Sequence, residues 1–175
     1  MIILITGDFG VGKDTFADIL LDRFEENNIS ANKIRSFTTR KPRYEGEKTH
    51  EFIHKNCWEK IRETNPDLIA AESEIGGEYY GTLKNQFNHD FSLYVVDDIG
   101  VREITKKYDD VFIVTIFRSK SLLKNIDKER LNREKKEEYN FYPDYVLIND
   151  GDIVCLRKKV ENFFFSFCFL NKPFN

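Results

Sequence analysis

A glycine-rich turn between an apolar run and a helical pattern is the feature that most restricts the fold of this chain. Ile2–Thr6 reads IILIT, which is typical of a strand buried on both faces of a parallel sheet. The next residues, Gly7 to Lys13, fit G-x-x-x-x-G-K, and the apolar positions that follow are spaced as in a helix with one buried stripe. A strand, a glycine loop and a helix form the first half of a β-α-β unit, so this order predicts an α/β fold.

The same alternation continues towards the C-terminus. Further strand patterns occur at residues 92–96, 111–117 and 145–148. Helical patterns occur at residues 101–107 and 119–138. Asp152 is the predicted N-cap of a closing helix. We therefore expect a mostly parallel central sheet covered by helices.

Composition argues against several classes of function. The 175 residues are 41% hydrophobic, which is enough for one domain with a core. A net charge of -3 favours neither a nucleic acid nor a membrane surface as partner. We see no signal-peptide pattern and no apolar run near the ~20 residues of a membrane helix. We expect a cytoplasmic protein whose cysteines, Cys57, Cys155 and Cys168, stay reduced.

The glycine loop has the chemistry to bind the phosphates of a nucleotide. Glycines let backbone N–H groups point inward, the helix N-terminus adds positive potential, and Lys13 reaches the outer phosphates. The expected ATP-binding residues are Gly7, Asp8, Phe9, Gly10, Val11, Gly12, Lys13, Asp14 and Thr15. After the lysine, a Mg²⁺-binding hydroxyl is usual, whereas this chain has Asp14. A carboxylate binds Mg²⁺ too, but it also stabilises a helix N-terminus, and both interpretations stay open.

A second cluster of polar residues has the chemistry to bind a phosphate monoester. Residues 36–43 read SFTTRKPR, which places hydroxyl and cationic groups on a segment stiffened by proline. Residues 78–82 read EYYGT. The surrounding stretch, 38–86, is polar and breaks the strand–helix alternation, so it is predicted to be a ligand-binding insertion.

With these segments the chain resembles the guanylate kinase family. The likeness extends from the glycine loop through TTRKPR and EYYGT to VVDD at 95–98 and DYVLIND at 144–150, in the family's order. It implies a three-layer P-loop kinase fold that transfers the γ-phosphoryl group of ATP, with Mg²⁺, to GMP or dGMP.

The resemblance also implies a division of the chain. A single domain, 1–175, would consist of a core at 1–37 and 91–175, a nucleoside-monophosphate-binding (NMP-binding) subdomain at about 38–90, and a short lid at about 124–138.

Individual roles follow at matching positions. Arg40, Arg43 and Tyr80 would hold the acceptor's phosphate, because guanidinium groups bind phosphate oxygens bidentately. Ser36 and carboxylates near residues 72 and 97 would read the base. The full expected NMP-binding set is Ser36, Arg40, Arg43, Glu45, His50, Glu72, Tyr80, Thr82 and Asp97.

Three positions depart from the family pattern. His50 stands where the family has a phosphate-binding tyrosine. Either Glu45 or Glu47 matches the acid that the family has between its second arginine and that tyrosine. The family's base-reading glutamate aligns to Ala71 without a gap, and to Glu72 only with one.

The segment 128–133, KERLNR, resembles part of the family's lid. Arg130 and Arg133 are therefore expected to face the phosphates, with Arg118 as a further cation, and the alternative is a solvated helix of Glu/Lys pairs. The expected catalytic residues are Lys13, Arg40, Arg43, Arg130 and Arg133.

Other interpretations remain at this point. Residues 50–54, HEFIH, match the zinc signature H-E-x-x-H, but that motif requires a helix and this stretch resembles a short strand. A kinase with another acceptor and a non-catalytic binding module are also open. The phenylalanine-rich segment 163–170 is expected to bury one side on the sheet, with the surplus phenylalanines packed in a dimer or against another helix. We therefore expect a monomer or a homodimer. Its expected partners, from the resemblance, are ATP and a nucleoside monophosphate.

Overall fold

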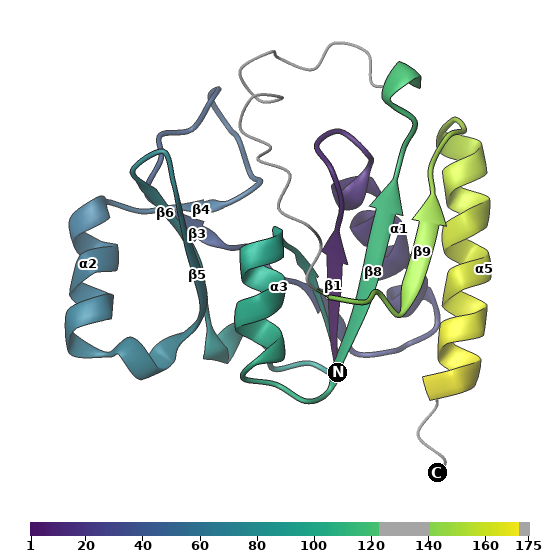
Figure 1. The fold of residues 1–175 in the computed structure, drawn as a ribbon. Coiled ribbons are helices and arrows are strands. Elements are labelled where there is room, and N and C mark those ends of the chain that lie inside the picture. The colour runs from purple at the N-terminus through teal and green to yellow at the C-terminus, as the bar shows by residue number, and fades with distance from the viewer. Residues whose placement is uncertain (123–140, 172–175) are drawn as a thin grey trace.

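The computed structural model describes residues 1–122 and 141–171. Its elements form a larger sheet with helices and a smaller sheet set to one side of it (Figure 1). No helix in the described ranges combines the length and apolar character needed to cross a membrane.

The larger sheet is parallel throughout. It comprises β1 (Ile2–Thr6), β2 (Ala31–Lys33), β7 (Phe91–Val95), β8 (Val111–Phe117) and β9 (Tyr145–Ile148). Their order is β2-β7-β1-β8-β9, so β1 pairs with a strand on each side. Every residue of β1 is buried, as the unbroken apolar run predicts for a central parallel strand. The arrows of β1, β8 and β9 point to the same edge of the sheet (Figure 1).

Helices cover both faces of this sheet, which confirms the predicted α/β architecture. On one face, α1 (Lys13–Glu26) and α5 (Ile153–Asn171) pack against alternate strand residues such as Ile3 and Ile5. On the other face, α3 (Asp98–Thr105) packs with Ile2 and Leu4. Side chains of successive strand residues point to opposite faces, so the apolar run supplies both cores.

The phenylalanine-rich segment serves mainly the first of these cores. Phe163, Phe164 and Phe167 of α5 are buried, and Phe24 of α1 contacts two of their rings at centroid distances of 5.5 and 6.4 Å. Phe165 and Phe169 on the same helix are exposed. The helix therefore buries one stripe on the sheet, as expected.

The smaller sheet is formed by residues between 37 and 83, so it begins one residue before the polar stretch 38–86. It comprises β3 (Phe37–Thr38), β4 (Glu51–Phe52), β5 (Ile69–Ile75) and β6 (Glu78–Leu83), in the order β4-β3-β6-β5. Helix α2 (Lys55–Thr64) packs on one face through Trp58. A Cβ on Gly81 of β6 would lie 2.2 Å from the Trp58 ring, so this close approach requires glycine. Three 3-10 turns, at Pro66–Leu68, Lys84–Gln86 and Lys120–Leu122, complete the described elements.

Other local predictions can be compared directly. Asp152 accepts a hydrogen bond from the Cys155 backbone N–H at 2.8 Å, which confirms it as the cap of α5. The H-E-x-x-H stretch contains strand β4, and His54 is the N-cap of α2, so the stretch lacks the helix that a zinc signature requires. The helical pattern at 119–138 falls mostly outside the described residues.

Replacing Phe163 with alanine is expected to lower the free energy of unfolding by roughly 3–5 kcal/mol, because the ring is 2% exposed and its loss leaves a cavity. Urea unfolding followed by circular dichroism measures this. Phe165→Ala is the matched control on the same helix, with a side chain that is 62% exposed, and it should change stability little. Equal losses for the two variants would contradict the packing described here.

Candidate active site

The glycine loop connects β1 to α1 at the carboxyl edge of the central sheet. Gly7, Gly10 and Gly12 have φ angles of 136°, 74° and 99°, which L-residues with side chains rarely adopt. A Cβ on Gly7 would lie 2.1 Å from the Ile116 carbonyl oxygen, so this position also requires glycine for space. Lys13 Nζ donates hydrogen bonds to the carbonyl oxygens of Gly7 and Asp8, both at 2.8 Å. The ammonium group therefore lies over the loop that the motif predicts to hold phosphates.

Asn149 holds the glycine loop through a hydrogen bond to its backbone. It follows β9, its side chain is buried, and its Nδ2 donates to the Val11 carbonyl oxygen at 2.7 Å. A Cβ on Gly12 would lie 2.8 Å from the same nitrogen. Sequence reasoning placed Asn149 in a family-like segment but gave it no role. Its position directly after a predicted strand was the available signal.

Two carboxylates near the loop have the hard oxygen ligands that Mg²⁺ prefers. Asp14 is exposed, and its Oδ1 lies 3.1 Å from Lys33 Nζ, so its charge already has a partner. Asp98, in the first turn of α3, accepts a hydrogen bond from Thr6 Oγ1 at 3.4 Å. Burial raises the pKa of Asp98, and a bound cation would favour its charged form. Asp97, which the family resemblance assigns to reading the base, caps α3 by accepting from Gly100 N–H at 2.8 Å.

A buried carboxylate organises the arginines of the smaller sheet. Arg40 donates through Nη1 and Nη2 to the two oxygens of Glu47, at 3.0 and 2.7 Å. The Arg43 backbone N–H and the Thr49 hydroxyl also donate to Glu47, both at 2.7 Å. Because Arg40 forms this fork, the pKa of Glu47 lies far below its usual range, and the pKa of Arg40 is raised. The Glu47 side chain is 1% exposed.

This arrangement decides between the two candidate acids. Glu45 is exposed in the loop, whereas Glu47 holds the arginines. The structure therefore replaces Glu45 with Glu47 in the candidate site. The sequence could not separate them because the two acids stand only two positions apart.

Aromatic groups join the arginine cluster to Ser36. The Arg40 guanidinium lies 5.1 Å from the centroid of the Phe52 ring. His50 Nδ1 is 2.8 Å from Ser36 Oγ, and its ring lies 5.5 Å from that of Tyr80. The structure thus brings Ser36, Arg40, His50 and Tyr80 together, as their assignment to one NMP-binding set predicts.

Glu72 lies away from this group. In the β5–β6 pairing, Ala71 is opposite Thr82 and Ser73 is opposite Tyr80, so these four residues share a face. Glu72 is on the other face, where it accepts from Trp58 Nε1 and pairs with Arg62 at 3.1 Å. Glu72 is therefore removed from the candidate site. Thr82 is on the expected face but fully buried.

Of the three further arginines expected near the phosphates, only Arg118 lies within the described residues. Arg118 Nη2 donates to the Gly151 carbonyl oxygen at 3.4 Å, close to the segment that carries Asn149. Arg130 and Arg133, with the predicted lid at 124–138, lie outside the described residues.

Comparisons with known proteins bear on this geometry. No protein-family model matches the chain. A guanylate kinase of Campylobacter jejuni is 31% identical over 170 residues, which cover 85% of this chain and 80% of that protein. The chain belongs to the guanylate kinase family. A guanylate kinase of Mycoplasma genitalium is 27% identical over 168 residues. That match covers 91% of this chain but only 61% of the relative's length.

A solved structure agrees at the level of the fold. The guanylate kinase of Anaplasma phagocytophilum superposes with a TM-score of 0.61 at 20% identity, over 95% of this chain and 85% of that one. At that identity the likeness supports the P-loop kinase fold of this guanylate kinase family member.

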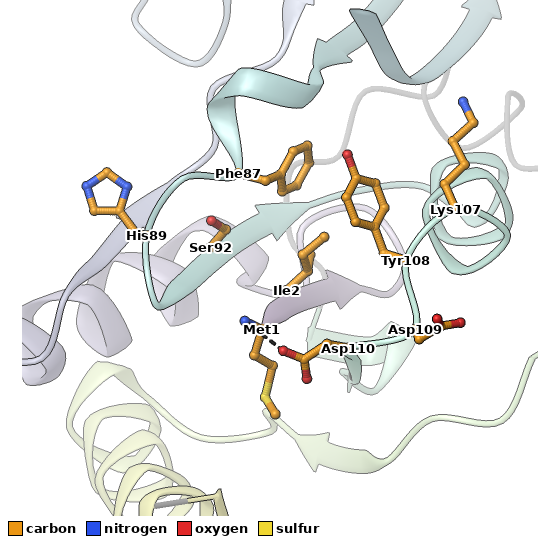
Figure 2. A pocket seen from close by; sticks show the side chains of 9 residues that line it. All are labelled: Met1, Ile2, Phe87, His89, Ser92, Lys107, Tyr108, Asp109 and Asp110. Carbon is orange, nitrogen blue, oxygen red and sulfur yellow. Dashed lines mark ion pairs between the residues drawn. The ribbon is translucent and has the colours of Figure 1, made fainter. Parts of the chain in front are cut away.

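A separate hollow lies at the opposite end of the central sheet (Figure 2). Its walls are formed by Met1, Ile2, Phe87, His89, Ser92, Lys107, Tyr108, Asp109 and Asp110. The N-terminal ammonium pairs with Asp110 at 2.9 Å across it. Because β1 begins at this end and the glycine loop follows its other end, the hollow is not part of the candidate active site of this guanylate kinase family member.

Glu47→Gln is expected to lower the free energy of unfolding at pH 7 by roughly 1–3 kcal/mol, because it weakens hydrogen bonds between charged groups. The folded-state pKa of Glu47 lies below its ordinary value of 4.5, so this stabilisation is present above that value and is lost as the pH falls further. The difference between wild type and variant should therefore shrink below about pH 4.5.

Urea unfolding at a series of pH values tests this, with Glu45→Gln as the exposed control two residues away. If the two variants were equally stable at pH 7, Glu47 would not be the organising carboxylate.

Proposed function

We propose that this chain is an ATP-dependent nucleoside monophosphate kinase that phosphorylates GMP and dGMP. The observation that carries this proposal is the pairing of two phosphate-binding arrangements on different parts of the fold. One is the glycine loop with Lys13 at the edge of the central sheet. The other is the arginine cluster built on Glu47 beside the smaller sheet. Transfer of a phosphoryl group requires one site for the donor nucleotide and a second site for the acceptor's phosphate.

On the donor side, the loop amides and Lys13 would bind the β- and γ-phosphates of ATP. Asp14 and Asp98 are the carboxylates that would hold Mg²⁺, directly or through water. When bound, Mg²⁺ neutralises charge that develops on the phosphate oxygens. Asn149 would keep the loop in the conformation that points its amides inward, through its hydrogen bond to Val11.

On the acceptor side, Arg40, Arg43 and Tyr80 would fix the phosphate as the nucleophile. The Nε of Arg40 is buried and has no hydrogen-bond partner within the described residues, so an oxygen of a bound phosphate is the kind of acceptor it lacks. A phosphate monoester is largely ionised near pH 7, so transfer requires no general base. Positioning and positive charge then supply the catalysis, with Arg130 and Arg133 of the expected lid as further cations.

The residues that would recognise the base support a second candidate for the acceptor. Ser36 and Asp97 remain the proposed readers of guanine. The β5 position on the acceptor face, however, carries Ala71, and Glu72 points to α2. Without a carboxylate from β5, a nucleoside monophosphate with another base is the alternative acceptor.

The localisation, oligomeric state and subdomain division of the protein stay predictions. We propose a cytoplasmic protein, monomeric or homodimeric, with an NMP-binding subdomain at about 38–90 and a lid at about 124–138, and with no nucleic-acid or membrane partner.

A coupled ADP-release assay with Mg-ATP tests the function against GMP, dGMP, AMP, dAMP, CMP, UMP and dTMP. Turnover with GMP and dGMP alone is the expected result. Turnover with another nucleotide would keep the mechanism and replace the acceptor. Tight ATP binding without transfer to any of the seven would indicate a binding module and refute the proposal.

Lys13→Ala and Arg40→Ala should each lower kcat/KM by at least about 100-fold, because each removes a charged contact to the transferring or accepting phosphate. Steady-state kinetics with the identified acceptor measure this. Arg23→Ala is the control, since Arg23 lies at the far end of α1 and pairs with Glu26. Near-normal kinetics in both active-site variants would rule out these assignments.

A further inference from the structure

His50 lies where the two halves of the acceptor site meet. It comes just before β4, and its Nδ1 is 2.8 Å from Ser36 Oγ, next to β3. Its ring contacts Tyr80 of β6 and Phe52 of β4, at centroid distances of 5.5 and 6.3 Å. Within the described part of the chain, the other ring nitrogen, Nε2, makes no hydrogen bond. The imidazole thus has one nitrogen bound to the proposed base reader and one available to a ligand.

The charges around His50 disfavour its cationic form in the free protein. Burial lowers the pKa of His50, and the positive charges of Arg40 and Arg43 lower it further. Glu47 and Asp14 act in the opposite direction, but Glu47 is bound to Arg40 and Asp14 is paired with Lys33. The free site therefore favours the neutral form of the imidazole, which lies beside two guanidinium groups.

We propose that His50 binds the acceptor's phosphate as an imidazolium, taking one proton from solvent as the phosphate dianion enters the site. The proposal rests on the function proposed above, because the acceptor's phosphate supplies the negative charge. The two charges of the dianion offset the repulsion from Arg40 and Arg43. Nε2–H then donates to a phosphate oxygen, and no bond other than N–H is formed.

Protonation of His50 also fixes the direction of its bond to Ser36. Both nitrogens of an imidazolium are donors, so Nδ1–H must donate to Ser36 Oγ. The Ser36 hydroxyl hydrogen is then released to another acceptor, such as a carbonyl oxygen of the base. In the neutral imidazole either direction is allowed. His50 therefore links binding of the phosphate to recognition of the base.

The proposal sets the sign of a pH dependence. The pKa of His50 is below its usual value without the phosphate and rises when the dianion binds. Between the two pKa values, binding takes up a proton, so affinity falls as the pH rises. The phosphate monoester has its second pKa near 6, so it is already a dianion from pH 7.0 to 8.5 and adds little to this dependence.

Isothermal titration of the full chain with GMP over this pH range, or with the monophosphate that the assay above identifies, tests the proposal. Wild type should bind up to about tenfold more weakly per pH unit. At fixed pH, the heat should change between two buffers of different ionisation enthalpy, which reports proton uptake. His50→Gln should show a nearly flat pH profile and no uptake. His89→Gln, an exposed histidine away from the site, should behave as wild type.

A second measurement does not depend on a variant. In wild type labelled with ¹⁵N at its histidines, the two ring nitrogens of His50 should shift to imidazolium values when the monophosphate binds at pH 7.5. A neutral His50 in the complex, or equal proton uptake in wild type and His50→Gln, would overturn the proposal while leaving the kinase activity intact. Failure of every monophosphate to bind would instead overturn the proposed function, and this inference with it.

Discussion

The proposed donor site depends on the position of β1 at the centre of a parallel sheet. Because β1 pairs with both β7 and β8, the carboxyl ends of these strands meet at one edge. The glycine loop, the N-terminus of α3 and Asn149 all follow strands that end there. Ligands of open α/β sheets bind at this edge for the same reason. The buried bond from Asn149 to Val11 then links the loop to β9, so the packing of the core directly sets the conformation of the phosphate-binding backbone.

The proposed acceptor site is organised by a different interaction, beside the smaller sheet. On one face of the smaller sheet, Trp58 of α2 is buried so close to β6 that Gly81 leaves no room for a Cβ. On the other face, the fork between Arg40 and Glu47 holds the guanidinium in place. A buried carboxylate that receives four hydrogen bonds orders its partners before any ligand binds, which lowers the cost of positioning. The proposed proton uptake at His50 extends this order towards Ser36.

Several parts of this arrangement could be predicted from the sequence. The strand of IILIT, the glycine loop and the capped final helix are local patterns, and the structure contains them. The cluster of Ser36, Arg40, His50 and Tyr80 followed from matching the chain to a family, because these residues are far apart in sequence. The prediction of Glu72 as a base reader was misplaced because successive residues of a strand point to opposite faces. The β5–β6 register shifts at the irregularity between Ile69 and Ala71. As a result, Ala71 rather than Glu72 lies on the face that carries Tyr80.

By itself, the sequence determined the order of the elements, the phosphate-binding loop and the types of residue available to each site, since these depend on local periodicity and on short motifs. Only the tertiary structure decided which partners each carboxylate has. Glu47 rather than Glu45 is buried against Arg40, Asp97 is used as a helix cap, and Asp98 lies beside Thr6. The physical reason is that a carboxylate's role depends on its burial and on its partners, and both arise from contacts between segments that the chain separates.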